Sequence, residues 1–315
     1  MGRSYDEINY SLRPAKHIER RMLCEIFRKM SAFQDLAEYR YVGMGSVYFS
    51  DFSLIHRELG LTNLLSIEKD SDRQERFKFN RPYKCIELQF EQSGDALAAL
   101  DWDDRTICWL DYDGQLDESI IADIGMFASN ACSGSLLTVS VNCHYVGGDQ
   151  SRVKTLKDAI GSDYIPNGIE EKQLSGWSAS ETVRKIMTDV IRNKLGSRNG
   201  GLDEFERISW HPCVNFQYQD GARMMTFGGV FVKSTELTQI QQWGVDSLEF
   251  SRTSGEEPPY KIEVPKLTFR ELRHLDQQLP TEDLSQLVCS GVSMKTLKIY
   301  QQIYRYFPNF AEMQI

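Results

Sequence analysis

Two short apolar runs of the chain end in residues that together could hold a nucleotide. The first run is followed by Gly43 and Gly45, with Ser46 directly after them, and the second run, at 64–67, is followed by Glu68. Glycines in a turn let the backbone approach a ligand that Cβ atoms would exclude. An acid at the end of the next strand, roughly 20 residues on, can accept hydrogen bonds from a ribose.

These residues need a framework of strand, turn, helix and parallel strand, and the pattern continues along the chain. Strand-like runs are expected at about 39–43, 63–67, 83–88, 106–111 and 135–142, and helices between them at about 50–59, 70–79, 93–100 and 116–128. Strands that alternate with short helices are typical of a parallel sheet covered on both faces. Ligands of such sheets bind outside the carboxyl ends of the strands.

A different strand pattern follows near residue 214. Residues 214–219 alternate apolar and polar side chains, Asp220 and Gly221 follow, and an apolar run returns at 223–232. Asp-Gly between two such runs predicts an antiparallel hairpin with a two-residue turn, in which both turn positions need positive φ. The sheet is therefore expected to end in an antiparallel pair.

Together these features resemble the class I S-adenosylmethionine-dependent methyltransferases. The likeness covers roughly 35–145 and 207–232 and rests on the five alternating strands, the Gly-x-Gly turn, the acid at 68 and the closing hairpin. It implies an α/β fold: a Rossmann-like, mostly parallel sheet of seven strands that ends in an antiparallel hairpin, with helices on both faces. A helical insertion and a C-terminal helical appendage are expected in addition.

The resemblance also implies site residues. Gly43 and Gly45 match the first two glycines of the family's cofactor loop, so that these glycines and Ser46 would bind S-adenosylmethionine. Glu68 matches the acid that binds the ribose hydroxyls, and Asp95 falls where the family often contacts the adenine amino group.

Two positions of the loop depart from the family pattern. The family usually has an acid two residues before the first glycine and a third glycine two residues after the second. Here those places hold Tyr41 and Val47. Such a loop is also compatible with a relative that has lost catalysis.

The end of the fourth strand carries the expected catalytic residues. Methyl transfer is an in-line displacement, so the protein mainly aligns acceptor, methyl group and sulfur, and a general base is needed only for a protonated acceptor. Asp111, Tyr112 and Asp113 supply two carboxylates and a phenol there. The proline pair typical of enzymes that methylate DNA bases is missing, which disfavours that activity.

A metal-dependent alternative rests on Asn142 and His144, which follow the fifth strand. With Asp111 or Asp113 they could coordinate a divalent ion that deprotonates a hydroxyl acceptor. The favoured interpretation is that both residues make ordinary hydrogen bonds at a strand end. No metal is therefore expected.

Composition and charge limit the other functions. The net charge of −9 disfavours non-specific binding to nucleic acid. Residues 1–10 lack the apolar block of a signal peptide, and no apolar run is long enough to span a membrane. Seven scattered cysteines without a Cys-x-x-Cys pair indicate buried thiols in a reducing, cytoplasmic location.

Helical segments at both ends could contact partners. The first helix, opened by Pro14, carries several basic residues, including Lys16 and Arg20, which are expected on a solvated face off its apolar stripe. The aromatic segment at 300–310 is expected to pack against the sheet or a partner chain. The methyl acceptor is expected to be either a small molecule or a macromolecule. A second expected interaction is with a protein partner, or with another copy of this chain, through these helices.

The expected organisation has four parts. They are an N-terminal helical segment (1–35), a cofactor-binding domain (36–145 and 206–235), an insertion or lid (146–205) and a C-terminal helical appendage (236–315). The expected function is methyl transfer from S-adenosylmethionine to an oxygen or nitrogen acceptor. A catalytically silent scaffold or sensor is the main alternative, and a nicotinamide-dependent oxidoreductase is disfavoured by the hairpin.

Overall fold

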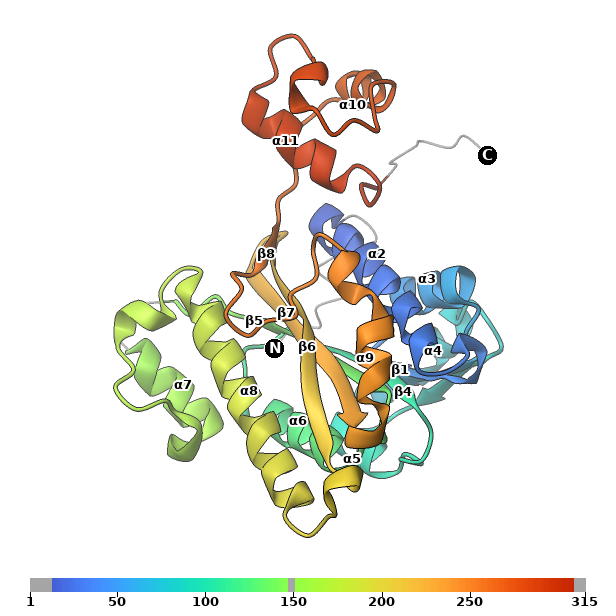
Figure 1. Ribbon diagram of the computed structural model, residues 1–315, viewed down its shortest axis with the longest axis vertical. Coiled ribbons are helices and arrows are strands. Elements are labelled where there is room, and N and C mark those ends of the chain that lie inside the picture. Colours follow the sequence, from blue (N-terminus) through green and yellow to red (C-terminus); the bar gives the residue numbers. More distant parts are fainter. Residues whose placement is uncertain (1–12, 147–150, 309–315) are drawn as a thin grey trace.

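The computed structural model describes residues 13–146 and 151–308. Residues 1–10, for which no signal peptide is expected, and the last two residues of the aromatic segment 300–310 lie outside that part. One mixed sheet runs through the molecule with helices packed on both of its faces (Figure 1). Its strands are β1 (Arg40–Gly43), β2 (Asn63–Ile67), β3 (Ile86–Gln89), β4 (Thr106–Asp111), β5 (Ser135–Asn142), β6 (Ile208–Gln219), β7 (Arg223–Lys233) and β8 (Tyr260–Ile262).

The strand order is β3-β2-β1-β4-β5-β7-β6-β8. Strands β1 to β5 are parallel, β7 is antiparallel to both β5 and β6, and β8 is parallel to β6. The expected fold is confirmed, with β8 adding an eighth strand to the seven that were predicted. Because β1 lies between β2 and β4, the strand order reverses there, and a ligand crevice is expected at the carboxyl ends of these strands.

Two helical layers cover the sheet. On one face α2, α3, α4 and α9 pack in one apolar core, and on the other face α5, α6, α7 and α8 pack in a second. The helices are α2 (Pro14–Arg28), α3 (Ser50–Leu59), α4 (Gln74–Asn80), α5 (Ser93–Ala98), α6 (Glu118–Asn130), α7 (Arg152–Ile160), α8 (Ser178–Asn199), α9 (Leu237–Trp243), α10 (Phe269–Asp276) and α11 (Met294–Ile303). The central strands β4 and β5 are buried almost throughout, as their apolar sequences require.

Helix α8 connects β5 to β6 across one face of the sheet (Figure 1). Both strands are antiparallel to β7 and therefore parallel to each other, and parallel strands need a crossover connection. Apolar residues of α8, among them Val183, Ile186 and Val190, lie in the same core as β4 and β5. The second half of the segment expected as an insertion is thus the crossover helix of the sheet.

The hairpin forms as predicted, but its turn differs. Gln219 pairs with Arg223, so the loop has three residues instead of two. Only Gly221 has positive φ, at 145°. The prediction of a two-residue turn was wrong because the Asp220 side chain is engaged elsewhere. It accepts hydrogen bonds from the first amides of α2, Ala15 N at 3.1 Å and Lys16 N at 2.9 Å.

The C-terminal helices α10 and α11 stand beyond the end of the sheet and follow β8 in the chain (Figure 1). They share a small core of their own around Leu275, Leu297 and Tyr300. A cavity of about 560 Å³ lies between this unit and the residues around Phe250 and Tyr260. None of the helices in the described ranges combines the length and apolarity needed to cross a bilayer.

Candidate functional site

The glycine loop and the acid after β2 are in direct contact. Glu68 Oε1 accepts hydrogen bonds from Gly45 N at 3.1 Å and from Ser66 Oγ at 2.7 Å. Gly45 N also lies 3.0 Å from Ser66 Oγ. The structure therefore brings two of the predicted cofactor-binding residues to one rim, at the carboxyl ends of β1 and β2.

Burial perturbs the ionisation of Glu68. Desolvation raises its pKa from an ordinary 4.5 to about 7, although hydrogen bonds from Ser66 and from the amides of Gly45 and Ser46 oppose the rise. A carboxyl group with a perturbed pKa at the edge of an α/β sheet is a candidate for binding or catalysis. A ligand that donates hydrogen bonds would favour the ionised form.

The loop itself is tightly packed against its own chain. A Cβ atom on Gly45 would lie 2.6 Å from Phe49 Cδ1 and 2.8 Å from Ser66 Oγ, and one on Gly43 would lie 2.8 Å from the Tyr41 hydroxyl oxygen. Ser46 and Phe49 both have positive φ, at 51° and 48°. Glycine is therefore needed at positions 43 and 45 to avoid the neighbouring side chains, whether or not a ligand binds.

Tyr112 contacts a buried carboxyl that the sequence did not single out. Asp123 of α6 accepts hydrogen bonds from Ser93 Oγ at 2.5 Å and from the Tyr112 hydroxyl at 2.6 Å, and burial raises the pKa of Asp123. The Tyr112 hydroxyl is thus directed to Asp123. Asp95 is exposed in the first turn of α5.

Asp111 forms an ion pair with a lysine of the first helix. Lys16 Nζ lies 2.5 Å from Asp111 Oδ1 and 2.8 Å from Glu19 Oε2, and it donates a hydrogen bond to the Tyr218 hydroxyl at 3.0 Å. Its ammonium also sits 4.5 Å from the centre of the Trp109 ring. Burial alone would lower the pKa of Lys16, but the carboxylates of Asp111 and Glu19 outweigh burial and raise it.

Part of the polar side of α2 is therefore buried, although a solvated face was expected, and Arg28 near the end of the helix is exposed as expected. Lys16, Glu19 and Arg20 are all buried, and Arg20 pairs with Asp51 of α3. These residues fall at positions 1, 4 and 5 after Ala15, on the flank of the apolar stripe that includes Ile18. The helical spacing of these three residues could have indicated that they are buried, but their charge led to the expectation that they face solvent.

A chain of hydrogen bonds links this cluster to the middle of the sheet. The Trp109 indole N–H donates to Ser140 Oγ at 2.9 Å, and Ser140 Oγ lies 2.6 Å from Thr226 Oγ1. Thr226 in turn donates to Glu19 Oε1. Because the one Thr226 proton goes to Glu19, the Ser140 proton goes to Thr226, and all four groups have a fixed orientation.

The other polar residues at this rim have local partners. Asn142 Oδ1 accepts a hydrogen bond from His144 N at 2.8 Å, and the His144 carbonyl accepts one from Gln115 at 2.9 Å. Asp113 is exposed next to Asp111. Throughout 13–146 and 151–308, no three His, Cys, Asp or Glu side chains gather in a way that could hold a metal ion.

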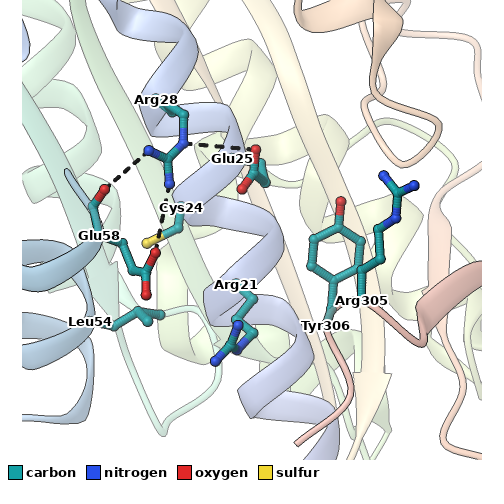
Figure 2. A pocket seen from close by; sticks show the side chains of 8 residues that line it. All are labelled: Arg21, Cys24, Glu25, Arg28, Leu54, Glu58, Arg305 and Tyr306. Carbon is teal, nitrogen blue, oxygen red and sulfur yellow. Dashed lines mark hydrogen bonds and ion pairs between the residues drawn. The ribbon is translucent and has the colours of Figure 1, made fainter. Parts of the chain in front are cut away.

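A cavity of about 200 Å³ lies on another side of α2, against α3 and the end of the C-terminal unit (Figure 2). Arg28 crosses it with ion pairs of 3.9 Å to Glu25 and to Glu58. Its lining consists of Arg21, Cys24, Glu25, Arg28, Leu54, Glu58, Arg305 and Tyr306. The glycine loop and the ends of β2 and β4 are not part of it.

Comparison with known proteins gives a match over nearly the whole chain. A family model described as "Putative O-methyltransferase" matches residues 8–315. Among the curated proteins, none matches the chain in sequence.

The similar solved structures share little sequence identity with this chain. One is an rRNA methylase from Streptococcus thermophilus (8% identity, 67% of this chain and 95% of that chain covered, TM-score 0.36). Another is Trm1 from Pyrococcus horikoshii in complex with S-adenosyl-L-methionine (10% identity, 73% and 58% covered, TM-score 0.42). A third is an O-methyltransferase family protein from Burkholderia thailandensis (10% identity, 67% and 56% covered, TM-score 0.33).

Proposed function

Since this chain belongs to the family described as "Putative O-methyltransferase", we propose that it is an S-adenosylmethionine-dependent methyltransferase whose acceptor atom is an oxygen. The observation that carries the proposal is the contact between Glu68 and the amide of Gly45 at the switch point of the sheet. This rim is where an α/β sheet of this strand order binds its ligand. The family description supports oxygen over nitrogen as the acceptor.

The residues of the rim fit the chemistry of the cofactor. Its ribose hydroxyls are hydrogen-bond donors, and Glu68 is a buried acceptor beside the loop. The backbone of Gly43 to Ser46 would hold the amino-acid part, and Asp95, exposed at the start of α5, would accept from the adenine amino group. When bound, the cofactor supplies an electrophilic methyl group on its sulfonium sulfur.

The acceptor side lies at the end of β4. Asp111 and Asp113 place two carboxylates there, and either one can accept the proton that a hydroxyl acceptor must lose. Tyr112 supports this end of β4 indirectly. Its hydroxyl donates a hydrogen bond to Asp123, which also accepts one from Ser93. The chain's own contribution is to align the acceptor, because the displacement itself needs little more than orientation.

Titration calorimetry with S-adenosylmethionine and with its demethylated product tests the cofactor assignment. We expect both to bind at micromolar level and the Glu68→Ala variant to bind at least about tenfold more weakly, which corresponds to about 1.4 kcal/mol. Glu87→Ala is the matched control, because Glu87 is an exposed acid on the neighbouring strand β3. Equal affinity of wild type and Glu68→Ala would overturn the role of Glu68.

A catalytically silent scaffold is the second candidate, and one observation favours it. Phe49 and Ser66 crowd Gly45, and the Tyr41 ring crowds Gly43, so the protein's own side chains occupy space beside both glycines. The absence of binding heat with either compound would support this function. The hairpin that disfavours a nicotinamide-dependent oxidoreductase is present as predicted.

A further inference from the structure

We propose that the cavity between the C-terminal unit and the sheet binds one base of a single-stranded RNA, whose phosphates lie along α11 on Lys295 and Lys298. The choice of RNA rests on the proposed function, since an oxygen acceptor requires a hydroxyl group, and the ribose of RNA carries a 2′-hydroxyl that DNA lacks. The binding site itself rests on the walls of the cavity, the charge of α11 and the place of both at the edge of the sheet.

Aromatic rings form much of the wall of this cavity, which has a volume of about 560 Å³, within the range of ligand sites. The aromatic residues that line it are Phe250, Tyr260, Tyr304 and Tyr306. Phe250 packs edge to face with Tyr260 and with Tyr306, at ring-centre distances of 6.2 and 5.5 Å, so these three rings hold one another in place. Tyr304 is partly buried, and a base can stack on a tyrosine ring whatever its sequence.

The polar groups of the cavity suit the edge of a base. Gln301 donates a hydrogen bond to the Thr281 carbonyl at 2.8 Å, and Gln302 donates one to Glu249 at 3.2 Å. A glutamine amide has two donor hydrogens and an acceptor oxygen, so both amides keep groups for a ligand. Glu249 and Glu282 also line the cavity. Because carboxylates accept hydrogen bonds from the amino groups of bases and repel phosphate, the cavity suits the base and not the backbone of the RNA.

The charge of the C-terminal unit is opposite to that of the chain as a whole. Residues 264–308 contain six lysines and arginines against four aspartates and glutamates, whereas the whole chain has a net charge of −9. Lys295, Lys298 and Arg305 are exposed and share one face of α11 and of the turn after it, because three- and seven-residue spacings return to the same side of a helix. Within the described residues, none of these three cations forms an ion pair with a carboxylate. Arg305 also lines the cavity, so this basic stripe runs into it.

The C-terminal unit leaves the sheet at the edge that carries the candidate cofactor rim. Strand β8 is parallel to β6 and therefore to β2 and β4, so the chain passes from β8 into α10 at the edge where β2 and β4 end (Figure 1). The strand register places Tyr260 and Asp111 in one row across the sheet, about 19 Å apart at the usual strand spacing. An RNA of about six stacked nucleotides spans that distance.

The charge of α11 is tested by the fluorescence anisotropy of a labelled, unpaired RNA of about ten nucleotides, without cofactor. We expect micromolar binding at low salt and a slope of about −2 for log affinity against log salt concentration, since each of three phosphate contacts contributes about −0.7. In Lys295→Gln/Lys298→Gln the slope should fall to about −0.7. Lys154→Gln/Lys157→Gln is the matched control, because these lysines have the same spacing and exposure on α7. No binding at low salt, or an equal loss of slope in the control, would overturn the proposal.

Tyr304 tests the cavity. Tyr304→Ala should weaken RNA binding at least about fivefold without changing the salt slope, because it removes a stacking surface and no charge. Tyr304→Phe keeps the ring and should bind as tightly as the wild type. Gln302→Ala, at an exposed position of the cavity wall, should also weaken binding, and it keeps the test valid if Tyr304→Ala lowers the melting temperature. Unchanged affinity in both alanine variants would show that charge alone holds the RNA, and would overturn the base site.

Two further ligands identify the class of partner. A DNA of the same sequence should bind no more tightly than the RNA, and polyglutamate of the same charge should compete poorly. Tighter binding of DNA would overturn the choice of RNA, and equal competition by polyglutamate would indicate an acidic protein instead.

Calorimetry with S-adenosylmethionine is run on the same variants and should give the wild-type affinity. Absence of cofactor binding in the wild type would contradict the proposed function, whereas RNA binding that ignores the substitutions in α11 and the cavity contradicts only this inference. The two failures are therefore distinguishable.

Discussion

The Oε1 atom of Glu68 lies 3.1 Å from the backbone nitrogen of Gly45. The strand register explains the contact, because Gly43 of β1 pairs with Ser66 of β2 and both chains then run two residues further. The acid and the loop thus meet as a consequence of parallel pairing. The same contact opposes the rise in the pKa of Glu68 that burial causes.

We expect stability and cofactor affinity to respond to pH in opposite directions through Glu68. Its pKa is raised from 4.5 to about 7, so the folded state prefers the protonated acid, and the resulting stabilisation is complete below pH 4.5 and lost as pH rises through about 7. The loss is on the order of 3 kcal/mol at most. Affinity for the ribose should increase over the same range, because the ionised form is the better acceptor.

Denaturation with urea at pH 5 and pH 8 checks this prediction. Glu68→Gln should show a smaller fall in unfolding free energy between the two pH values than the wild type. An identical pH dependence in both proteins would show that the Glu68 carboxyl does not titrate in this range.

Gly45→Ala should disrupt the loop, because the new Cβ atom would lie 2.6 Å from the Phe49 ring and 2.8 Å from Ser66 Oγ. We expect a loss of about 1–3 kcal/mol of unfolding free energy from overpacking, together with weaker cofactor binding. Gly114→Ala is the matched control, since a Cβ atom there meets nothing within 4 Å. A Gly45→Ala protein as stable as Gly114→Ala would contradict the packing described here.

Asp220→Ala should destabilise α2, because it removes the acceptor for the amides of Ala15 and Lys16. A lost helix cap costs about 0.5–2 kcal/mol, and hydrogen exchange should show faster opening at the start of α2. Asp35→Ala, at the exposed cap of the short helix Leu36–Glu38, is the comparison and should cost less. Slower or unchanged exchange in α2 would refute the cap.

Tyr112→Phe should affect stability more than methyl transfer. The change removes one of the two donors to the buried Asp123 carboxyl, which we expect to cost about 1 kcal/mol in chemical denaturation. Tyr164→Phe, at an exposed tyrosine, should cost nothing measurable. If Tyr112→Phe instead keeps full stability while cofactor binding or transfer falls, the hydroxyl acts on a ligand and not on Asp123.

The local pattern of the chain was sufficient for the sheet and its helices. Apolar runs without alternation predict strands buried on both faces, and those at 63–67, 106–111 and 135–142 form β2, β4 and β5 with the expected bounds. The Asp-Gly pair located the hairpin. Its exact turn could not be read, because the Asp220 side chain is recruited by a helix 204 residues away.

By itself, then, the sequence determined the order of strands and helices, the glycine turn and the acid that meets it, because periodicity and turn chemistry are local properties of the chain. Only the tertiary structure decided that Lys16 and Glu19 are buried and that Lys16 holds Asp111 and Tyr218, partners 95 and 202 residues distant. Periodicity shows which face of a helix is covered, but it does not show which charges lie opposite. A charged residue beside an apolar stripe is buried only if a distant strand supplies its counter-ion.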